Sequence, residues 1–183
     1  MSIIPQDPVL FQGTIRKNLD PFGESSDEKL WDVLRKTDLI PSDKIDVVKQ
    51  QDKHDDNVHK FHLDRTVEDD GTNFSLGEKQ LLSFARALVR ESKILILDEA
   101  TSSVDYETDN KIQNTMVREF SDCTILCIAH RLKTIVNYDK ILVLDKGERK
   151  EFDTPWNLFN LEGGIFQQMC EKSSIVADDF QRK

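Results

Sequence analysis

Residues 93–99 read Lys-Ile-Leu-Ile-Leu-Asp-Glu, an apolar run that ends in two adjacent carboxylates. A short, β-rich apolar segment bounded by charge is typical of a central strand in a parallel sheet. Open α/β sheets bind ligands at the carboxyl ends of their strands, which is where Asp98 and Glu99 would lie. Two carboxylates at that edge suit a magnesium–nucleotide site, although a pair of solvated acids at an ordinary strand end would show the same pattern.

A helix start precedes this strand in the chain. Residues 73–80 read Asn-Phe-Ser-Leu-Gly-Glu-Lys-Gln, and apolar positions then recur with helical spacing as far as Leu88. Ser75 is a favourable N-cap, and Glu78 three residues later completes a capping box. The helix N-terminus would present Ser75 and the amide of Gly77 outward, which makes a cradle for phosphate. An ordinary capped helix is the alternative.

Together with other segments, these two motifs resemble the ATPase domain of ABC transporters. In chain order the matching motifs are the Q-loop glutamine at Gln6, the Leu-Ser-Gly-Gly-Gln signature at 74–78, the Walker B strand at 94–99, the D-loop at 100–105 and the switch histidine at His130. Residues 13–22, Gly-Thr-Ile-Arg-Lys-Asn-Leu-Asp-Pro-Phe, further resemble subfamily C, the multidrug-resistance-associated transporters.

The resemblance implies an α/β fold of the P-loop NTPase-like (RecA-like) type, with a partial parallel-sheet core and an inserted helical subdomain. The implied divisions are the Q-loop end of the core at 1–9, the helical subdomain with the signature helix at 10–92, the remaining core at 93–172 and a tail at 173–183. Within 93–172 the apolar patterns predict strands at 93–98, 123–129, 139–145 and 148–152, and helices at 106–119 and 131–136.

The resemblance also assigns ATP and Mg²⁺ as cofactors. It makes Glu99 and His130 the catalytic residues, with Glu99 as general base and His130 holding the attacking water near the γ phosphate. Mg²⁺ would be held by Asp98 and Gln6. Nucleotide contacts are implied for Gln6, Ser75, Gly77, Asp98 and Asp105. Asp105 could instead cap helix 106–119, which is compatible with a place in the D-loop.

The signature departs from the family pattern at two positions, Leu76 in place of Gly and Glu78 in place of Gln. A β-carbon at 76 limits close approach of the backbone to phosphate, and a carboxylate at 78 adds negative charge near a triphosphate. We therefore expect weaker ATP contact in the site that this signature completes with the phosphate loop of a partner domain. With Glu99 intact, this combination resembles the second nucleotide-binding domain of subfamily C.

The family's phosphate loop, G-x-x-x-x-G-K-[ST], does not occur in residues 1–183, because none of the seven glycines precedes a lysine. In the family this loop lies upstream of the Q-loop glutamine, which here is already Gln6. The expected identity is the C-terminal part of a nucleotide-binding domain, inactive when isolated. The alternative is a truncated product or pseudogene remnant without ATPase activity.

Composition narrows the expected partners. The chain carries a net charge of −9, which disfavours nucleic acid, and it has no apolar run near the ~20 residues that span a bilayer. We expect a head-to-tail dimer with a second ABC ATPase domain and contact with the transmembrane domains of the parent transporter. The domain would lie on the cytoplasmic face of the plasma or vacuolar membrane and power export of organic anions, conjugates or drugs. A non-transport ABC ATPase is less favoured, because residues 3–22 match the exporter form.

Three further expectations concern local structure. Residues 49–62 are polar and weakly patterned, so we predict an exposed loop there. The tail from Asp178 to Lys183 is predicted to be disordered. Cys123 and Cys127 lie on one face of a predicted strand, where core thiols are expected rather than a disulfide.

Overall fold

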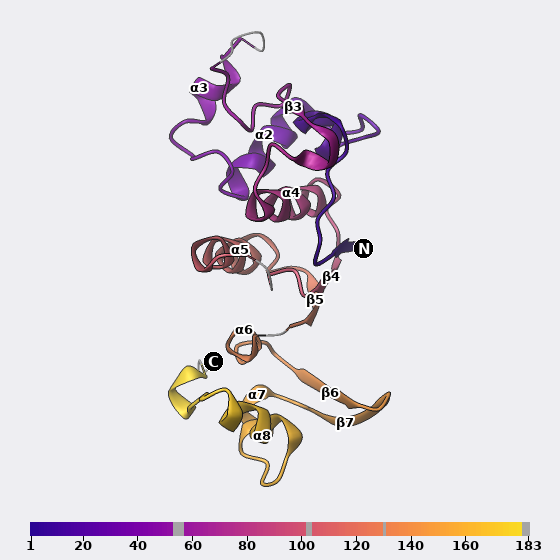
Figure 1. Ribbon diagram of the computed structural model, residues 1–183, viewed down its shortest axis with the longest axis vertical. Coiled ribbons are helices and arrows are strands. Elements are labelled where there is room, and N and C mark those ends of the chain that lie inside the picture. Colours follow the sequence, from indigo (N-terminus) through magenta and orange to yellow (C-terminus); the bar gives the residue numbers. More distant parts are fainter. Residues whose placement is uncertain (53–56, 102–103, 130, 181–183) are drawn as a thin grey trace. The chain divides into compact units, whose positions relative to one another are not determined.

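The computed structural model describes residues 1–52, 57–101, 104–129 and 131–180. The chain forms two compact units, Met1–Ile128 and Ala129–Lys183 (Figure 1), and each is considered separately. Ser102 and Ser103 of the D-loop segment and His130 lie outside the described residues, as do residues 53–56 of the predicted loop and 181–183 of the predicted tail.

The first unit contains the parallel sheet, with strand order β1-β4-β5. β1 spans Ser2–Ile4, β4 spans Ile94–Asp98 and β5 spans Thr124–Ile128. β4 therefore lies between two parallel neighbours, which confirms it as a central strand. The register pairs Ile4 with Leu97 and Leu97 with Cys127, so these three residues share one face.

The two faces of this sheet differ in burial. Ile4, Leu95 and Leu97 are fully buried, and Cys123 and Cys127 pack against the same core as free thiols, as predicted. The opposite face exposes a row of large apolar side chains: Ile3, Ile94, Leu126 and Ile128. Because side chains alternate along a strand, Asp98 belongs to this exposed face.

Helix α4, Leu76–Val89, is the centre of the first unit and packs against β1 and three other helices. It buries Leu81, Leu82, Phe84 and Ala85 in one core. The neighbouring elements are α1 (Ile15–Leu19), α2 (Asp27–Lys36), α3 (Ile45–Lys49) and α5 (Tyr106–Glu119), with the short antiparallel pair β2 (Gly13–Thr14) and β3 (Thr66–Val67) and the 3₁₀ turn η1 (Asp69–Gly71). Helix α5 has the predicted bounds.

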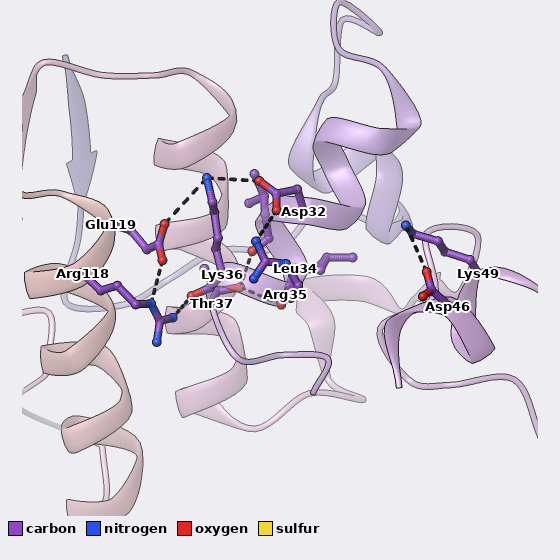
Figure 2. A network of polar contacts seen from close by, with 10 residues as sticks. Asp32, Leu34, Arg35, Lys36, Thr37, Asp46, Lys49, Arg118 and Glu119 are labelled. Atoms are coloured by element: carbon purple, nitrogen blue, oxygen red, sulfur yellow. Dashed lines mark hydrogen bonds and ion pairs between the residues drawn. The ribbon is translucent and has the colours of Figure 1, made fainter. Parts of the chain in front are cut away.

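Ion pairs join the C-terminal ends of α2 and α5 (Figure 2). The Lys36 ammonium lies 3.1 Å from Asp32 on its own helix and 3.7 Å from Glu119 on α5. Arg118 adds a contact of 3.6 Å to Asp38, in the turn after α2. These side chains are partly exposed, so each pair contributes at most about 1 kcal/mol to stability.

The prediction of an exposed loop at 49–62 is only partly right. Its described residues after Lys49 form no strand or helix, but Val58, Phe61 and His62 are buried. The Phe61 ring lies 5.7 Å from that of Phe74, and His62 meets Trp31 edge-to-face at 5.2 Å. These contacts join residues that are far apart in sequence, so a local sequence pattern cannot predict them.

The second unit has its own small core. Strands β6 (Ile141–Asp145) and β7 (Glu148–Asp153) form an antiparallel hairpin that is a separate sheet, and the helices are α6 (Leu132–Ile135), α7 (Pro155–Phe159), α8 (Ile165–Lys172) and the 3₁₀ turn η2 (Ala177–Asp179). Lys146 and Gly147 connect these two strands, and both have positive φ, as a two-residue hairpin turn requires. The expectation of a disordered tail is wrong for Phe180, which is buried and lies 4.7 Å from the Phe159 ring.

Candidate functional site

Three of the predicted site residues lie at one edge of the parallel sheet. Gln6 follows β1 closely, while Asp98 ends β4 and Glu99 comes directly after it. Because the strands are parallel neighbours, their carboxyl ends form a single edge, the usual position of ligand sites in such sheets. His130 follows the end of β5 in the chain but lies outside the described residues.

The backbone at Glu99 is unusual. Its φ of 49° is left-handed, a region that costs a residue with a β-carbon about 1–2 kcal/mol. The Glu99 amide donates a hydrogen bond of 2.9 Å to the carbonyl of Ile128, which holds the turn against the end of β5. Strained backbone of this kind persists where its surroundings fix it, and it clusters at functional sites.

The predicted capping box at the start of α4 is present. The Ser75 hydroxyl accepts from the Glu78 amide at 3.2 Å, and the Glu78 carboxylate accepts from the Ser75 amide at 2.7 Å. Ser75 is exposed, as expected. The carboxylate of Glu78 also accepts from the Lys60 ammonium, which lies 5.1 Å from the ring centroid of Phe74.

Gly77 is buried, which corrects the expectation that this part of the helix faces outward. A β-carbon at Gly77 would lie 2.6 Å from Cγ2 of Thr108, on the first turn of α5. The sequence predicted a close approach to phosphate, but the close approach seen here is between two helices. As the second residue of α4, Gly77 still has an amide with no acceptor within the helix.

Asp105 caps α5, the alternative that its sequence position left open. Its carboxylate accepts from the Thr108 amide at 3.0 Å and from the Thr108 hydroxyl at 2.8 Å. These hydrogen bonds, the backbone one first, lower the pKa of Asp105. Through Thr108, the D-loop side of α5 and the signature start of α4 are therefore in contact.

Gln80 belongs to this site, although the motifs did not identify it. The side chain is completely buried, and its Nε2 donates to the carbonyls of Ala100 at 2.5 Å and Pro5 at 2.9 Å, with Gln6 at 3.3 Å. The available signal was an amide on the apolar side of a helix, one turn before Phe84. A buried polar side chain needs hydrogen-bonding partners, and here the partners are two predicted site loops.

A half-buried arginine on α4, Arg86, organises residues 9–18. The Arg86 guanidinium donates to the carbonyls of Val9 and Asn18 and to the Asn18 side chain, each at 2.7 Å. Burial lowers the pKa of Arg86, yet an arginine remains charged at any physiological pH. This network holds the start of the segment that resembles subfamily C against the signature helix.

The donor set at the sheet edge fits Mg²⁺. Asp98 and Gln6 are exposed and supply carboxylate and amide oxygens, the hard ligands that this ion prefers. Glu99 stands beside them as a second carboxylate. The arrangement suits binding of a magnesium-bound phosphate group and activation of a water molecule.

A sequence model described as ABC transporter matches residues 1–102. The chain belongs to the ABC transporter family. It is 65% identical, over its whole length, to the oligomycin resistance ATP-dependent permease of Saccharomyces cerevisiae. It is 47% identical to ATP-binding cassette sub-family C member 3 of Rattus norvegicus, with 96% of the chain covered. Relatives with subfamily C names confirm the resemblance to that subfamily.

The fold comparison agrees with this assignment. A bacterial Atm1-family ABC exporter with ATP bound superimposes with a TM-score of 0.74 and 32% identity over 94% of this chain. The P-loop NTPase-like α/β fold is thereby confirmed. The chain spans 13% of the yeast permease, 11% of the rat protein and 28% of the bacterial exporter chain. Within the described residues, no helix is both long and apolar enough to cross a bilayer.

Proposed function

We propose that this chain is part of the second ATPase domain of a subfamily C exporter, which couples ATP hydrolysis to transport of organic anions, conjugates or drugs. The observation that carries the proposal is the position of Gln6, Asp98 and Glu99 at the same edge of the parallel sheet. Names among the relatives support the substrate class: they include an efflux transporter of multiple drugs and a bile acid permease.

In this proposal each strand end has one task. Asp98 and Gln6 hold Mg²⁺, which would neutralise phosphate charge when bound. Glu99 would accept the proton of the attacking water, and the hydrogen bond from its amide to Ile128 holds the turn that carries this carboxylate. His130, which follows β5 in the chain, would orient the same water.

Ser75, Gly77 and Asp105 act at the opposite site of a head-to-tail dimer with a second ABC ATPase domain. That site takes its phosphate loop from the partner domain and the signature from this chain. Leu76 and Glu78 make it the weaker of the two sites. The transmembrane domains of the parent place the chain at the cytoplasmic face of a plasma or vacuolar membrane.

Residues 1–183 by themselves should not hydrolyse ATP. They contain no phosphate-loop lysine or amide cradle for the β and γ phosphates, and the apolar face of β1, β4 and β5 is exposed. We expect this polypeptide alone to aggregate and to show no turnover in an ATPase assay. If this polypeptide were a monomer with ordinary enzymatic turnover, ~1–10 s⁻¹, hydrolysis would not need the phosphate loop, and this expectation would be wrong.

The test of the function is Glu99→Gln in the parent transporter. The change is nearly isosteric, so ATP binding should persist while hydrolysis falls by about 10²–10⁴-fold, the usual loss of general-base assistance. Glu91→Gln is a matched control, since Glu91 is also a glutamate at left-handed φ, 49°, but precedes β4 instead of following it. Unchanged turnover in Glu99→Gln would show that Glu99 is only an acid at a strand end.

A further inference from the structure

We infer that Gln80 is a positioning residue that joins the magnesium-binding loop after β1 to the start of the D-loop after β4. Its single amide nitrogen lies within hydrogen-bonding distance of carbonyls from both loops: Pro5 and Gln6 on one side and Ala100 on the other. The inference rests on the proposed function, because that proposal gives the two loops their catalytic meaning.

The geometry fixes which end of the amide faces the loops. An amide nitrogen has two hydrogens and an amide oxygen has none, so three carbonyl oxygens can surround only the nitrogen. The shorter distances, 2.5 Å to Ala100 and 2.9 Å to Pro5, use both hydrogens, and Gln6 at 3.3 Å shares one of them. Oε1 of Gln80 is buried and has no partner among the described residues. The orientation of the Gln80 side chain is therefore set by its hydrogen bonds to the two loops.

This arrangement makes the position of one loop depend on the other. Gln80 sits on α4, one turn into the helix that begins with the signature. Its side chain is completely buried, so water cannot replace a lost donor without entering the core. A movement of α4 would carry Gln80 away from both sets of carbonyls. The backbone of Gln6, and the side chain that would hold Mg²⁺, would then lose a fixed position.

The first test replaces the amide in the parent transporter. Gln80→Met keeps the volume and removes the donor, so we expect the Mg²⁺ concentration for half-maximal ATP hydrolysis to rise about tenfold, the effect typical of losing a partner that orients a metal ligand. Ser83→Ala is the matched control, because Ser83 is also buried on α4 but hydrogen-bonds only within its helix, to Lys79. An unchanged Mg²⁺ midpoint in Gln80→Met would overturn the inference.

The second test uses pH rescue by Gln80→Glu. An ionised carboxylate at this position has no donor and repels the three carbonyls, whereas a protonated one regains one O–H donor. Burial raises the pKa of a carboxyl, so the variant should recover part of its Mg²⁺ affinity as the pH is lowered, while the unmodified protein should not. If the Mg²⁺ affinity of Gln80→Glu does not recover as the pH is lowered, the inference about Gln80 is contradicted.

Hydrogen exchange separates this inference from the proposed function. In Gln80→Met, amides of residues 3–8 and 97–101 should exchange about tenfold faster together, and in Ser83→Ala neither segment should change. If the unmodified parent transporter hydrolyses no ATP, the function proposal fails, but paired acceleration of exchange in Gln80→Met still supports the inference about Gln80. If exchange rises in only one segment or in neither, Gln80 does not join the loops, whatever the ATPase result.

Discussion

The ammonium of Lys60 lies 2.7 Å from one carboxylate oxygen of Glu78 and 2.9 Å from the other. From the sequence alone, Glu78 is an unpaired negative charge in a signature that must approach a triphosphate. In the structure that charge is paired and also caps α4. The repulsion attributed to Glu78 is therefore smaller than the sequence suggested, and Lys60 becomes part of the signature surface.

Removing Lys60 should expose that repulsion. Lys60→Met should weaken ATP at the site that this signature completes by about 3–10-fold, since an unpaired carboxylate close to a triphosphate costs on the order of 1 kcal/mol in a partly exposed setting. Adding Glu78→Gln should restore most of the loss. Site-resolved nucleotide trapping in the parent transporter measures this, with Lys29→Met, which breaks a pair with Glu91, as control. Equal affinity in the single and double variants would show that the pair is independent of nucleotide.

The remaining weakness of the signature should then lie mainly at Leu76. Leu76→Gly removes the β-carbon, allows closer approach of the backbone to phosphate and should tighten ATP at the same site. Adding Glu78→Gln should add a smaller increment, because Lys60 already offsets the charge. Hydrolysis at the site that uses Glu99 should change only through coupling between the sites. Nucleotide trapping that shows unaltered or weaker occupancy would refute the degenerate-site proposal.

Gly77→Ala should destabilise the protein through overpacking. The new methyl group would lie 2.6 Å from Cγ2 of Thr108, so one helix must shift, at a typical cost of about 1–3 kcal/mol in the free energy of unfolding. Thr108→Ser removes that methyl and keeps the hydroxyl that donates to Asp105. Urea unfolding of the parent transporter, with each change alone and with both, should show partial rescue of stability in the double variant. If Thr108→Ser gives no rescue, the contact does not explain why position 77 is glycine.

Stability should fall as the pH drops below about 6.5, the ordinary pKa of histidine. Burial lowers the pKa of His62, with a smaller contribution from Arg16, while Asp64 acts in the opposite direction. The Nδ1 atom of His62 accepts from the Asp64 amide at 3.2 Å, which requires an unprotonated nitrogen. Between these two pKa values, His62 is protonated in the unfolded chain but not in the folded protein. The contribution of His62 to stability is therefore complete above pH 6.5 and is lost as the pH falls towards the lower pKa of His62 in the folded protein.

His62→Asn should reduce that slope, because the amide oxygen can accept the same hydrogen bond without titrating. Burial also lowers the pKa of His59, so part of the slope should remain in this variant. Unfolding free energies between pH 5 and 8 measure both effects, with His59→Asn as comparison. A slope that is unchanged by His62→Asn would place the titrating group elsewhere.

Local physics was enough to predict several features from the sequence. The apolar run before Asp98 predicts a central strand, Ser75 and Glu78 predict a capping box, and Lys146-Gly147 predicts a hairpin turn; all three are present. Asp105 marks the start of α5 because a carboxylate before a helical pattern caps it. Each signal involves residues within a few positions of one another, so neighbouring chemistry decides the outcome.

Only the tertiary structure decided what the buried polar and aromatic groups do. Nothing near Gln80 in sequence shows that it reaches Pro5 and Ala100, and nothing near Lys60 shows that it pairs with Glu78. Phe61 packs against Phe74 and Phe180 packs against Phe159, and both are buried. Neither partner is close in sequence, so the sequence predicted an exposed loop and a disordered tail for these two segments. The sequence by itself determined the strands, the caps and the family motifs, because those depend on residues that are close together in the chain. Which loops share a hydrogen-bond donor depends on how those elements pack.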